Sequence, residues 1–530
     1  MTSTNSLVQA VEWHQQGHIA QARQIYESVL VTDPNHFDAR HLLGVTYLQT
    51  NDLELAHTHI QAALNIHPAS AAAHSNLGRV WHESKAYEKA VASYDQAIAL
   101  KPDFAEAHYN KGNALRELKQ MEAANACYQA AIALKPNYAE AYQNLGVIAQ
   151  EQRHLAQAVA YYDQAIALQP THAQARSNRG VALKAMHRIE EALKSFDLAI
   201  SVNPNYAQAY WNKAITLLLD GQYDKGWQLY EWGWAAKQRG TPRHTHLPLW
   251  KGLHAIQGKT ILLHAEQGYG DTLQFCRFAQ TLSDMGATVW LEVPSALIDL
   301  MRDLKGVQRL IPMGQAITEP VDFQCPLLSL PLALKTTLQS IPTATAYLHA
   351  EPSRSALWAS KLAGFQNKKV GLVWNGGFRA HQPELWLVNS ERNVALTQLA
   401  QHLQHSNIDF FSLQKGDPAE SELRGHETAH WPQGNMHNFT QELHTFADTA
   451  ALIDQLDLVI SVDTSTAHLA AAMGKPVWLL NRYDSCWRWL RHIDHSPWYP
   501  SVRIYRQNEV RQWHAPLQKM AKDLTQFAKA

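Results

Sequence analysis

The sequence has few cysteines and no long apolar run, which argues against two classes of protein. Its four cysteines are far apart among 530 residues and include no CxxC pair. This spacing argues against a disulfide framework or a zinc knuckle and favours reduced thiols in the cytoplasm. No stretch of 18 apolar residues is present, so we expect no membrane-spanning helix. The first residues lack a basic flank and an apolar core, so we expect no signal peptide.

An excess of charge of one sign is also missing. The 46 Lys and Arg residues nearly balance the 47 Asp and Glu residues, for a formal net charge of −1. Global charge therefore predicts no nucleic-acid partner. The chain is 46% apolar and 18% charged, so it can bury substantial cores and is not of a disordered type. Its length suffices for three or four domains.

Four columns of residues recur every 34 positions in the first part of the chain. They are prolines (Pro34, Pro68, Pro102, Pro136, Pro170, Pro204), glycines (Gly44, Gly78, Gly112, Gly146, Gly180), alanines (Ala22, Ala56, Ala90, Ala124, Ala158, Ala192) and bulky residues (Tyr26, Ile60, Tyr94, Tyr128, Tyr162, Phe196, Tyr230). This period and order resemble the tetratricopeptide repeat, in which each unit is a pair of helices. Small residues let the helices approach, and proline ends the second helix. About seven units are expected between residue 3 and roughly residue 238, with degenerate units at both ends.

A fifth column consists of asparagines two residues before the glycine position. Its members are Asn76, Asn110, Asn144, Asn178 and Asn212. They fall on the first helix of each unit, which lines the concave face in this repeat class. Carboxamides offer donors and acceptors to an extended peptide backbone, and the ladder resembles the one that holds the acceptor polypeptide in O-linked N-acetylglucosamine transferase. The alternative is that asparagine is simply common at this place in such repeats.

After Gly240 the period stops, and strand and helix patterns alternate. Strands are expected at KTILLHA (259–265), ATVWLEV and VQRLIP, and then, after a break near 331–367, at KKVGLVWNGG, IDFFSLQKG, DLVISVD and KPVWLLN. Helical patterns such as TLQFCRFAQTLSDMG and FADTAALIDQL lie between them. This alternation predicts two Rossmann-like halves in tandem, with ligands bound at the carboxyl ends of parallel strands.

The stretch SVDTSTAHLAAAMG (461–474) places small polar groups at the end of a buried strand. Thr464, Ser465 and Thr466 can cap the following helix and leave its first N–H groups open to a phosphate. Asp463 can accept sugar hydroxyls, and His468 can donate to a phosphate oxygen. The alternative is a well-capped helix without a ligand.

This stretch resembles the donor-binding motif of glycosyltransferase family 9, the lipopolysaccharide heptosyltransferases. The family pattern is D-T/S-G-x-x-H-L-x-A-A-x-x-x-P, and this chain has Ser465 where glycine is usual. Because of that departure, neither the sugar nor the nucleotide of the family is carried over. The resemblance covers roughly residues 258–525 and implies a GT-B fold.

The turn AEQGYGD (265–271) contains Gly268 and Gly270 but has Leu273 at the third position, so it is not a GxGxxG dinucleotide fingerprint. It resembles the amino-terminal turn of the heptosyltransferases, whose aspartate is the proposed base. The resemblance gives Asp271 that role, since a carboxylate in the cleft can take the proton of an acceptor hydroxyl. The alternative for Asp271 is an ordinary helix cap.

The segment VWNGG (373–377) ends another strand and is expected to face the same cleft with Trp374, Asn375 and Gly376. Its glycines permit close backbone approach to a ligand. Three cations are candidates for holding the leaving diphosphate: first Lys415, then Arg392, and also Arg379. Each of them is alternatively a surface charge.

Two further motifs bear on metals. No two aspartates are separated by one residue, so the metal-holding DxD of many single-Rossmann glycosyltransferases is missing. We expect no metal and no cofactor, with the diphosphate stabilised by a helix dipole and cations. HETAH (426–430) matches the HExxH zinc signature, but Gly425 precedes it and no apolar periodicity surrounds it, so we interpret it as a chance match.

The segment DSCWRWLRHIDHSPWYP (484–500) is dense in aromatics and arginines. Such residues can line an acceptor or base pocket, and they can equally form core and domain-closing contacts. We favour the second interpretation.

Together these patterns predict an all-α tetratricopeptide superhelix (1–240), an acceptor-side Rossmann-like half (241–365) and a donor-side half (366–530). The domain order resembles that of O-linked N-acetylglucosamine transferase. It implies a metal-independent, inverting transfer from a nucleotide-sugar to a protein acceptor. Relatives that act on flagellins make a flagellar or surface protein the expected acceptor, and repeat arrays often self-associate into oligomers. Two alternatives stay open: a scaffold with an inactive transferase fold, and a transferase acting on glycan or lipid.

Overall fold

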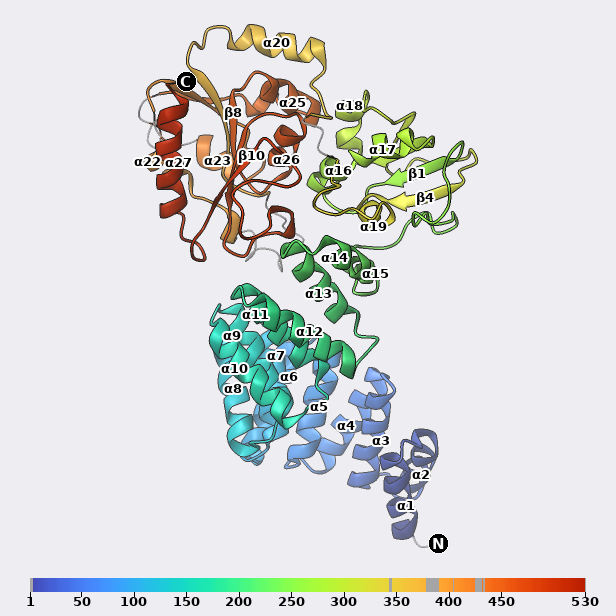
Figure 1. Ribbon diagram of the computed structural model, residues 1–530. Helices are drawn as coiled ribbons and strands as arrows, with labels where there is room; N and C mark the ends of the chain where they lie inside the picture. Colours follow the sequence, from blue (N-terminus) through green and yellow to red (C-terminus); the bar gives the residue numbers. More distant parts are fainter. Residues whose placement is uncertain are drawn as a thin grey trace. The chain divides into compact units, whose positions relative to one another are not determined.

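The computed structural model describes residues 3–342, 346–377, 390–403, 405–424, 431 and 434–529. The chain forms two compact units, residues 1–204 and residues 205–530. Figure 1 shows helices alone in the first unit and two sheets with helices in the second.

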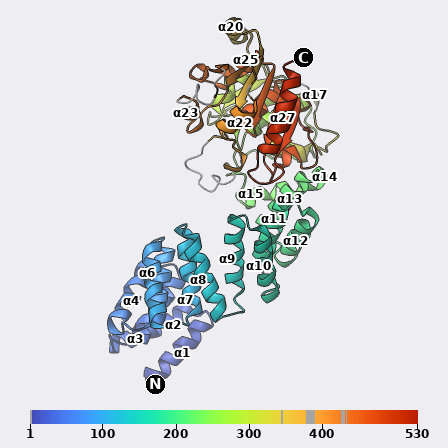
Figure 2. The same cartoon turned by 90° about the vertical axis from the view of Figure 1, so that its left-hand side faces the viewer.

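The first unit is a series of antiparallel helix pairs that follow one another in chain order (Figure 2). The helices are α1 (Ser3–Gln15), α2 (Ile19–Thr32), α3 (Phe37–Gln49), α4 (Leu53–Ile66), α5 (Ala71–Glu83), α6 (Tyr87–Leu100), α7 (Ala105–Glu117), α8 (Met121–Leu134), α9 (Ala139–Glu151), α10 (Leu155–Leu168), α11 (Ala173–Ala185) and α12 (Ile189–Val202). The glycine column is explained by contact within each pair. A Cβ added at Gly146 would lie 2.5 Å from the ring of Tyr162, so only glycine lets α9 and α10 pack this closely.

The second unit begins with the last repeat, which consists of α13 (Ala207–Leu219), α14 (Tyr223–Tyr230) and α15 (Trp232–Ala235). This repeat packs directly on the α/β part of the same unit. Trp498 Nε1 donates to Tyr223 Oη at 2.9 Å, and Arg491 pairs with Asp220 at 2.8 Å. Trp227 meets Trp487 edge to face, with ring centroids 5.2 Å apart. The predicted domain limits at residues 240 and 365 stay predictions.

The first sheet of the second unit is parallel, with the strand order β3-β2-β1-β4. Its strands are β1 (Thr260–His264), β2 (Thr288–Val293), β3 (Arg309–Pro312) and β4 (Phe323–Pro326). The connecting helices are α16 (Tyr269–Phe275), α17 (Phe278–Asp284), η1 (Ser295–Leu297), α18 (Ile298–Met301), η2 (Leu327–Ser329) and α19 (Leu330–Ala333). We call residues 241–365 the N-half; it also carries α20 (Pro352–Leu362).

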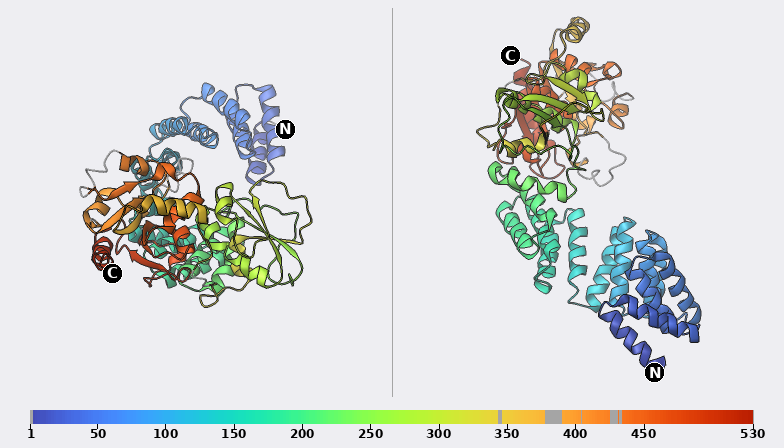
Figure 3. Two further views of the ribbon diagram at one scale, coloured as in Figure 1. Left: turned by 90° about the horizontal axis from the view of Figure 1, so that it is seen from above. Right: turned by 90° about the vertical axis from the view of Figure 1, so that its right-hand side faces the viewer.

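The second sheet, also parallel, has the order β10-β9-β8-β5-β6-β7 and belongs to residues 366–530, which we call the C-half. Its strands are β5 (Lys368–Val373), β6 (Ile408–Ser412), β7 (Met436–Asn438), β8 (Leu458–Val462), β9 (Val477–Asn481) and β10 (Val502–Arg506). Its helices are α22 (Leu396–Leu403), α23 (Ala419–Arg424), η4 (Thr440–Glu442), α25 (Phe446–Asp454), α26 (Ser465–Ala472), η5 (Trp487–Trp489) and α27 (His514–Phe527). Figure 3 shows the N-half in green and yellow beside the C-half in orange and red.

These observations confirm the predicted fold class, a tetratricopeptide array followed by two parallel α/β halves of GT-B type. The strand order of the C-half places β5 at its centre, between β8 and β6. Strands β6 and β7 are added on one side of β5 and strands β8 to β10 on the other, so the strand order reverses at β5. The carboxyl ends of β5, β6 and β8 therefore outline a crevice of the kind in which open α/β sheets bind ligands. The helix expected over TLQFCRFAQTLSDMG is divided into α16 and α17 at Cys276 and Arg277.

Candidate active site

The turn after β8 positions three hydroxyl side chains at the start of α26. Thr464 is the N-cap of this helix, and its Oγ1 accepts a hydrogen bond from the N–H of Ala467 at 3.4 Å. Ser461 Oγ lies 3.1 Å from the same hydroxyl and fixes its orientation. The first N–H groups of the helix therefore begin at a cavity lined by Thr464, Ser465 and Thr466.

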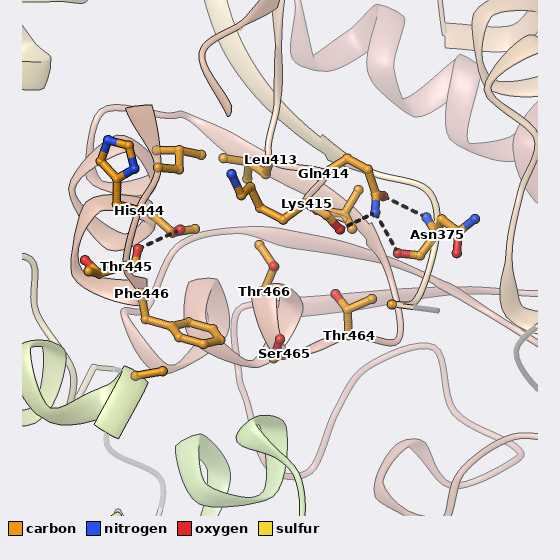
Figure 4. Close-up of a pocket in the computed structure, with 15 residues that line it drawn as sticks. Asn375, Leu413, Gln414, Lys415, His444, Thr445, Phe446, Thr464, Ser465 and Thr466 are labelled. Atoms are coloured by element: carbon orange, nitrogen blue, oxygen red, sulfur yellow. Dashed lines mark hydrogen bonds between the residues drawn. The ribbon is translucent and has the colours of Figure 1, made fainter. Parts of the chain in front are cut away.

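This cavity, which we call cavity A, has a volume of about 300 Å³ and is formed mainly by the C-half. Figure 4 shows Gln414 and Lys415, from the end of β6, on one side and the residues of α26 on the other. The ring of Phe446, the first residue of α25, also lines it. Much of the lining of cavity A is apolar, with Val373, Leu413 and Leu443 among its residues.

Gln414 holds the loop after β5 in place. Its buried Oε1 accepts from the N–H groups of Trp374 at 3.1 Å and Asn375 at 2.9 Å. Its Nε2 donates to the carbonyl of Asn375 at 3.2 Å. Asn375 lines cavity A, whereas the fully buried Trp374 lies in the core and donates its indole N–H to Glu422. The side chain of Trp374 therefore anchors the loop in the core and does not line the cavity.

A second hollow, cavity B, adjoins cavity A and shares Gly377, Thr464 and Ser465 with it. It has a volume of about 380 Å³ and lies between the two halves. Its lining is charged. The remaining residues are Gly268, Tyr269, Gly270 and Asp271 from the N-half, and Arg392, Asp463, His468 and Arg488 from the C-half.

Asp271 is held at both carboxylate oxygens. It stands in the first turn of α16, where its Oδ2 accepts from the N–H of Gly268 at 3.0 Å. Its Oδ1 accepts from Nη2 of Arg488, which belongs to the other half of the unit. Its side chain is 19% exposed and lines cavity B. Asp271 is thus a helix-capping group and a cavity carboxylate at the same time.

His468 lies one turn into α26 and closes one side of cavity B. Its Nδ1 is 2.9 Å from Tyr499 Oη, and its Nε2 is 3.8 Å from Asp463. Burial lowers the pKa of His468 to about 4, so the imidazole is neutral near pH 7. A Cβ added at Gly270 would lie 2.9 Å from the His468 ring, so this glycine allows α16 and α26 to approach each other.

The predicted cations occupy different places. Arg392 lines cavity B, donates from Nη1 to the carbonyl of Asp463 at 3.0 Å, and lies against Gly376. Lys415 lines cavity A, and its Nζ donates to the carbonyl of Thr440 at 2.7 Å. Arg379 and the HETAH segment lie outside the described residues. Among the described residues, no group of three or more His, Cys, Asp or Glu is arranged to hold a metal ion.

Three members of the asparagine column make side-chain contacts within the repeats. Asn144 donates from Nδ2 to Asn113 Oδ1 at 2.9 Å and is buried. Asn76 contacts His41 Nε2 at 3.0 Å, and Asn212 accepts from Gln208 at 3.1 Å. Asn76, Asn110, Asn144 and Asn178 belong to the first unit, and Asn212 belongs to the second. A bound peptide would compete with these internal contacts.

Arg488 was missed by sequence reasoning. The segment around it does form core contacts, because Trp487, Trp489 and Trp498 are buried. Arg488 nevertheless lines cavity B, and its side chain is 12% exposed. The sequence did contain a signal, an arginine between two tryptophans, which indicates a guanidinium held by stacking on an aromatic ring. In the structure, Arg488 Cζ lies 4.2 Å from the centroid of the Trp487 ring.

Comparison with known proteins identifies the two kinds of sequence that the chain combines. Tetratricopeptide-repeat models match residues 14–80, 78–118, 112–152, 139–172 and 173–206. The model of glycosyltransferase family 9 (heptosyltransferase) matches residues 395–523. The chain thus joins tetratricopeptide repeats to a family 9 domain, which supports a glycosyltransferase with a repeat-based binding region. In the described residues, no helix is long and apolar enough to cross a membrane, and all four cysteines are free.

One curated relative is Protein FlbA of Caulobacter vibrioides, which is 26% identical over 342 residues. The match covers 59% of this chain and 54% of FlbA, so the chain spans about half the length of the curated relative it matches. Among solved structures, YrrB, "a TPR protein with an unusual peptide-binding site", is 23% identical, with a TM-score of 0.30 over 35% of this chain and 95% of its own. MamA is 25% identical, with a TM-score of 0.29 over 31% of this chain and 97% of its own.

Proposed function

We propose that the protein transfers a sugar from a nucleotide-sugar to a protein acceptor held by the repeats. The observation that carries the proposal is the pair of adjoining cavities at the start of α26. Cavity A offers apolar walls and Phe446 for a nucleoside, and cavity B offers charged groups for the diphosphate and the sugar. The first N–H groups of α26 and the cations Arg392 and Lys415 suit a diphosphate.

In this proposal Asp271 is the base and the anomeric centre is inverted in one displacement. The acceptor hydroxyl attacks the anomeric carbon from the N-half side while its proton passes to Asp271. Asp463 accepts hydroxyls of the sugar, and the neutral His468 offers a hydrogen bond without adding charge. No metal takes part. The reaction takes place in the cytoplasm, on a flagellar or surface protein before its export.

The transfer is tested with a panel of nucleotide-sugars labelled in the sugar and incubated with the protein and an extract of its source cells. We expect label in the protein fraction with the wild type and none with Asp271→Asn. Label in the glycan or lipid fraction would contradict the protein acceptor. Absence of label from every fraction, with every donor, would favour the inactive scaffold.

A further inference from the structure

Asp271 and Arg488 form an ion pair across the two halves inside cavity B. Asp271 comes from α16 of the N-half and Arg488 from η5 of the C-half, 217 residues later. Both side chains line the cavity together with Thr464 and Ser465. The guanidinium is therefore within the space where a leaving diphosphate would stand beside the start of α26.

The surroundings of Arg488 keep it charged and orient it. Its Nε donates to Gln274 Oε1 at 2.8 Å, its Nη1 contacts Cys486 Sγ at 3.2 Å, and its plane lies over Trp487. Burial alone would lower its pKa, but Asp271 and Cys486 outweigh this and raise the pKa above its usual value. The side chain is a fixed cation in cavity B, and in the absence of ligand its anionic partner is Asp271.

We propose that Arg488 binds the leaving diphosphate and that its pairing with Asp271 makes donor binding precede action of the base. The inference rests on the proposed function and adds a residue and an order to it. Without donor, Oδ1 of Asp271 is occupied by its ion pair with Arg488 and does not face the acceptor. When the diphosphate enters, the guanidinium turns its charge to the phosphate oxygens and releases Oδ1 of Asp271 toward the acceptor.

The charges balance through the transfer step. The acceptor oxygen forms a bond to the anomeric carbon, and the bond from that carbon to the phosphate oxygen breaks. The hydroxyl proton passes to Asp271, and the electron pair of the broken bond stays on the diphosphate, where Arg488 compensates the new negative charge. In this proposal the ion pair between Asp271 and Arg488 separates only when the donor diphosphate binds. Deprotonation of the acceptor therefore does not precede donor binding.

The proposal makes an unusual prediction, because Asp271 and the diphosphate compete for one cation. Removing the charge of Asp271 must then tighten the binding of a diphosphate, although the residue is needed for turnover. The competition is a coupling between two anions at one site, and such couplings typically change affinity by about 5- to 150-fold. We expect Asp271→Asn to bind a nucleoside diphosphate on the order of tenfold more tightly than the wild type.

The test is calorimetric titration of the full chain with UDP, GDP, ADP and inorganic pyrophosphate. The variants are Asp271→Asn, Arg488→Gln, Arg488→Lys and the double variant Asp271→Asn with Arg488→Gln. Arg488→Gln is expected to weaken binding about tenfold, Arg488→Lys to weaken it less, and the double variant to lose the tightening. Asp463→Asn is the matched control, because it removes a carboxylate that also lines cavity B but lies 3.8 Å from His468 Nε2, whereas Arg488 pairs with Asp271. The thermal midpoint of each variant is measured first, and Arg488→Lys serves if Arg488→Gln does not fold.

The outcomes separate this inference from the function on which it rests. Unchanged or weaker binding in Asp271→Asn, while the wild type binds a nucleoside diphosphate, overturns the charge exchange and leaves the transferase intact. Equal tightening in Asp271→Asn and Asp463→Asn assigns the effect to overall charge and also overturns it. No binding of any probe by the wild type overturns the proposed function and this inference together.

Discussion

At the scale of single residues, two buried histidines stand out because they are held neutral. Burial lowers the pKa of both His264 and His468 to about 4. His264 ends β1, where its Nε2 contacts Gln324 Oε1 at 2.9 Å and its ring faces His244. Arg243, His244 and Glu292 are the charged or titratable groups that act on it. In the unfolded chain each imidazole returns to the ordinary histidine pKa of 6.5.

This difference makes the second unit sensitive to acid. Between pH 6.5 and pH 4 these histidines are protonated in the unfolded chain but stay neutral in the folded chain. Their contribution to the free energy of unfolding is therefore complete above pH 6.5 and is lost as the pH falls. Each histidine contributes about 3 kcal/mol to this loss. His264→Gln is therefore expected to flatten the decline in unfolding free energy between pH 6.5 and 5, measured by urea unfolding with tryptophan fluorescence. His495→Gln, at a largely exposed position, is the control and should keep the slope; an unchanged slope in His264→Gln would refute the assignment.

Several residues that line the two cavities could be predicted from the sequence because they lie in the segments that follow strands. Asp271, Asn375, Lys415 and Asp463 each come shortly after a buried apolar run, and parallel strands bring such positions to one edge. The partner of Asp271 was not predictable, because Arg488 comes from a segment without strand or helix periodicity. Trp374 was predicted to lie in the donor site because of its place in a turn. In the structure this large apolar side chain is buried in the core.

At the scale of elements, the turn between the two helices of each repeat shows a column that the sequence conceals. Seven residues at a spacing of 34 adopt positive φ angles: Gly17, Asn51, Lys85, Lys119, Arg153, His187 and Gly221. Only the first and last are glycine, so no residue type marks the position. The conformation is imposed by the helix pair, and the five other residues bear the steric cost of a Cβ in the left-handed region.

Lys119 is suited to a test of this cost because it is exposed and has a φ of 61°. Lys119→Gly should stabilise the repeats by roughly 0.5–1 kcal/mol, since glycine adopts this conformation without strain. Lys119→Ala keeps the Cβ and should give no such gain, which makes it the matched control. Urea unfolding followed by circular dichroism measures both; equal stability of the two variants would contradict the explanation.

The strands that sequence reasoning missed have a common position. β4, β7 and β10 are edge strands of their sheets, whereas the central strands β1, β5 and β8 were all predicted. β4 and β7 have only four and three residues, and β10 carries two arginines; short length and charge both limit further pairing at an edge. The fourth edge strand, β3, was predicted. β10, with its sequence VRIYR, shows why a search for apolar runs does not detect them.

At the scale of the whole molecule, the last repeat belongs to the second unit, together with the two α/β halves. Its period continues the array, yet residues 205–240 group with the α/β part. Tyr223, Trp227 and Tyr230 are buried there against Phe275, Trp487 and Trp498. The same repeat also contributes Glu231, which shares the buried Arg239 with Glu266.

A cut at residue 205 and a cut at residue 241 should therefore behave differently. Burial of three large aromatic side chains is worth on the order of 10 kcal/mol, which is comparable with the whole stability of an ordinary domain. Residues 205–530 should fold with a cooperative thermal transition, and residues 241–530 should be aggregated or melt much lower. Calorimetry and size-exclusion chromatography compare the two fragments. Equal behaviour would show that the last repeat is dispensable for folding of the α/β halves.

The central claim, that the two cavities bind a nucleotide-sugar, is tested most directly by a thermal-shift panel on the full chain. UDP, GDP, ADP, CMP and their common sugar conjugates are each added to the wild type and to Asp463→Ala. A ligand at 100 times its dissociation constant stabilises the folded state by about 2.7 kcal/mol. We predict a rise in the melting temperature with one nucleotide family, and a smaller rise with its sugar conjugate in Asp463→Ala. No shift with any nucleotide would contradict the donor site.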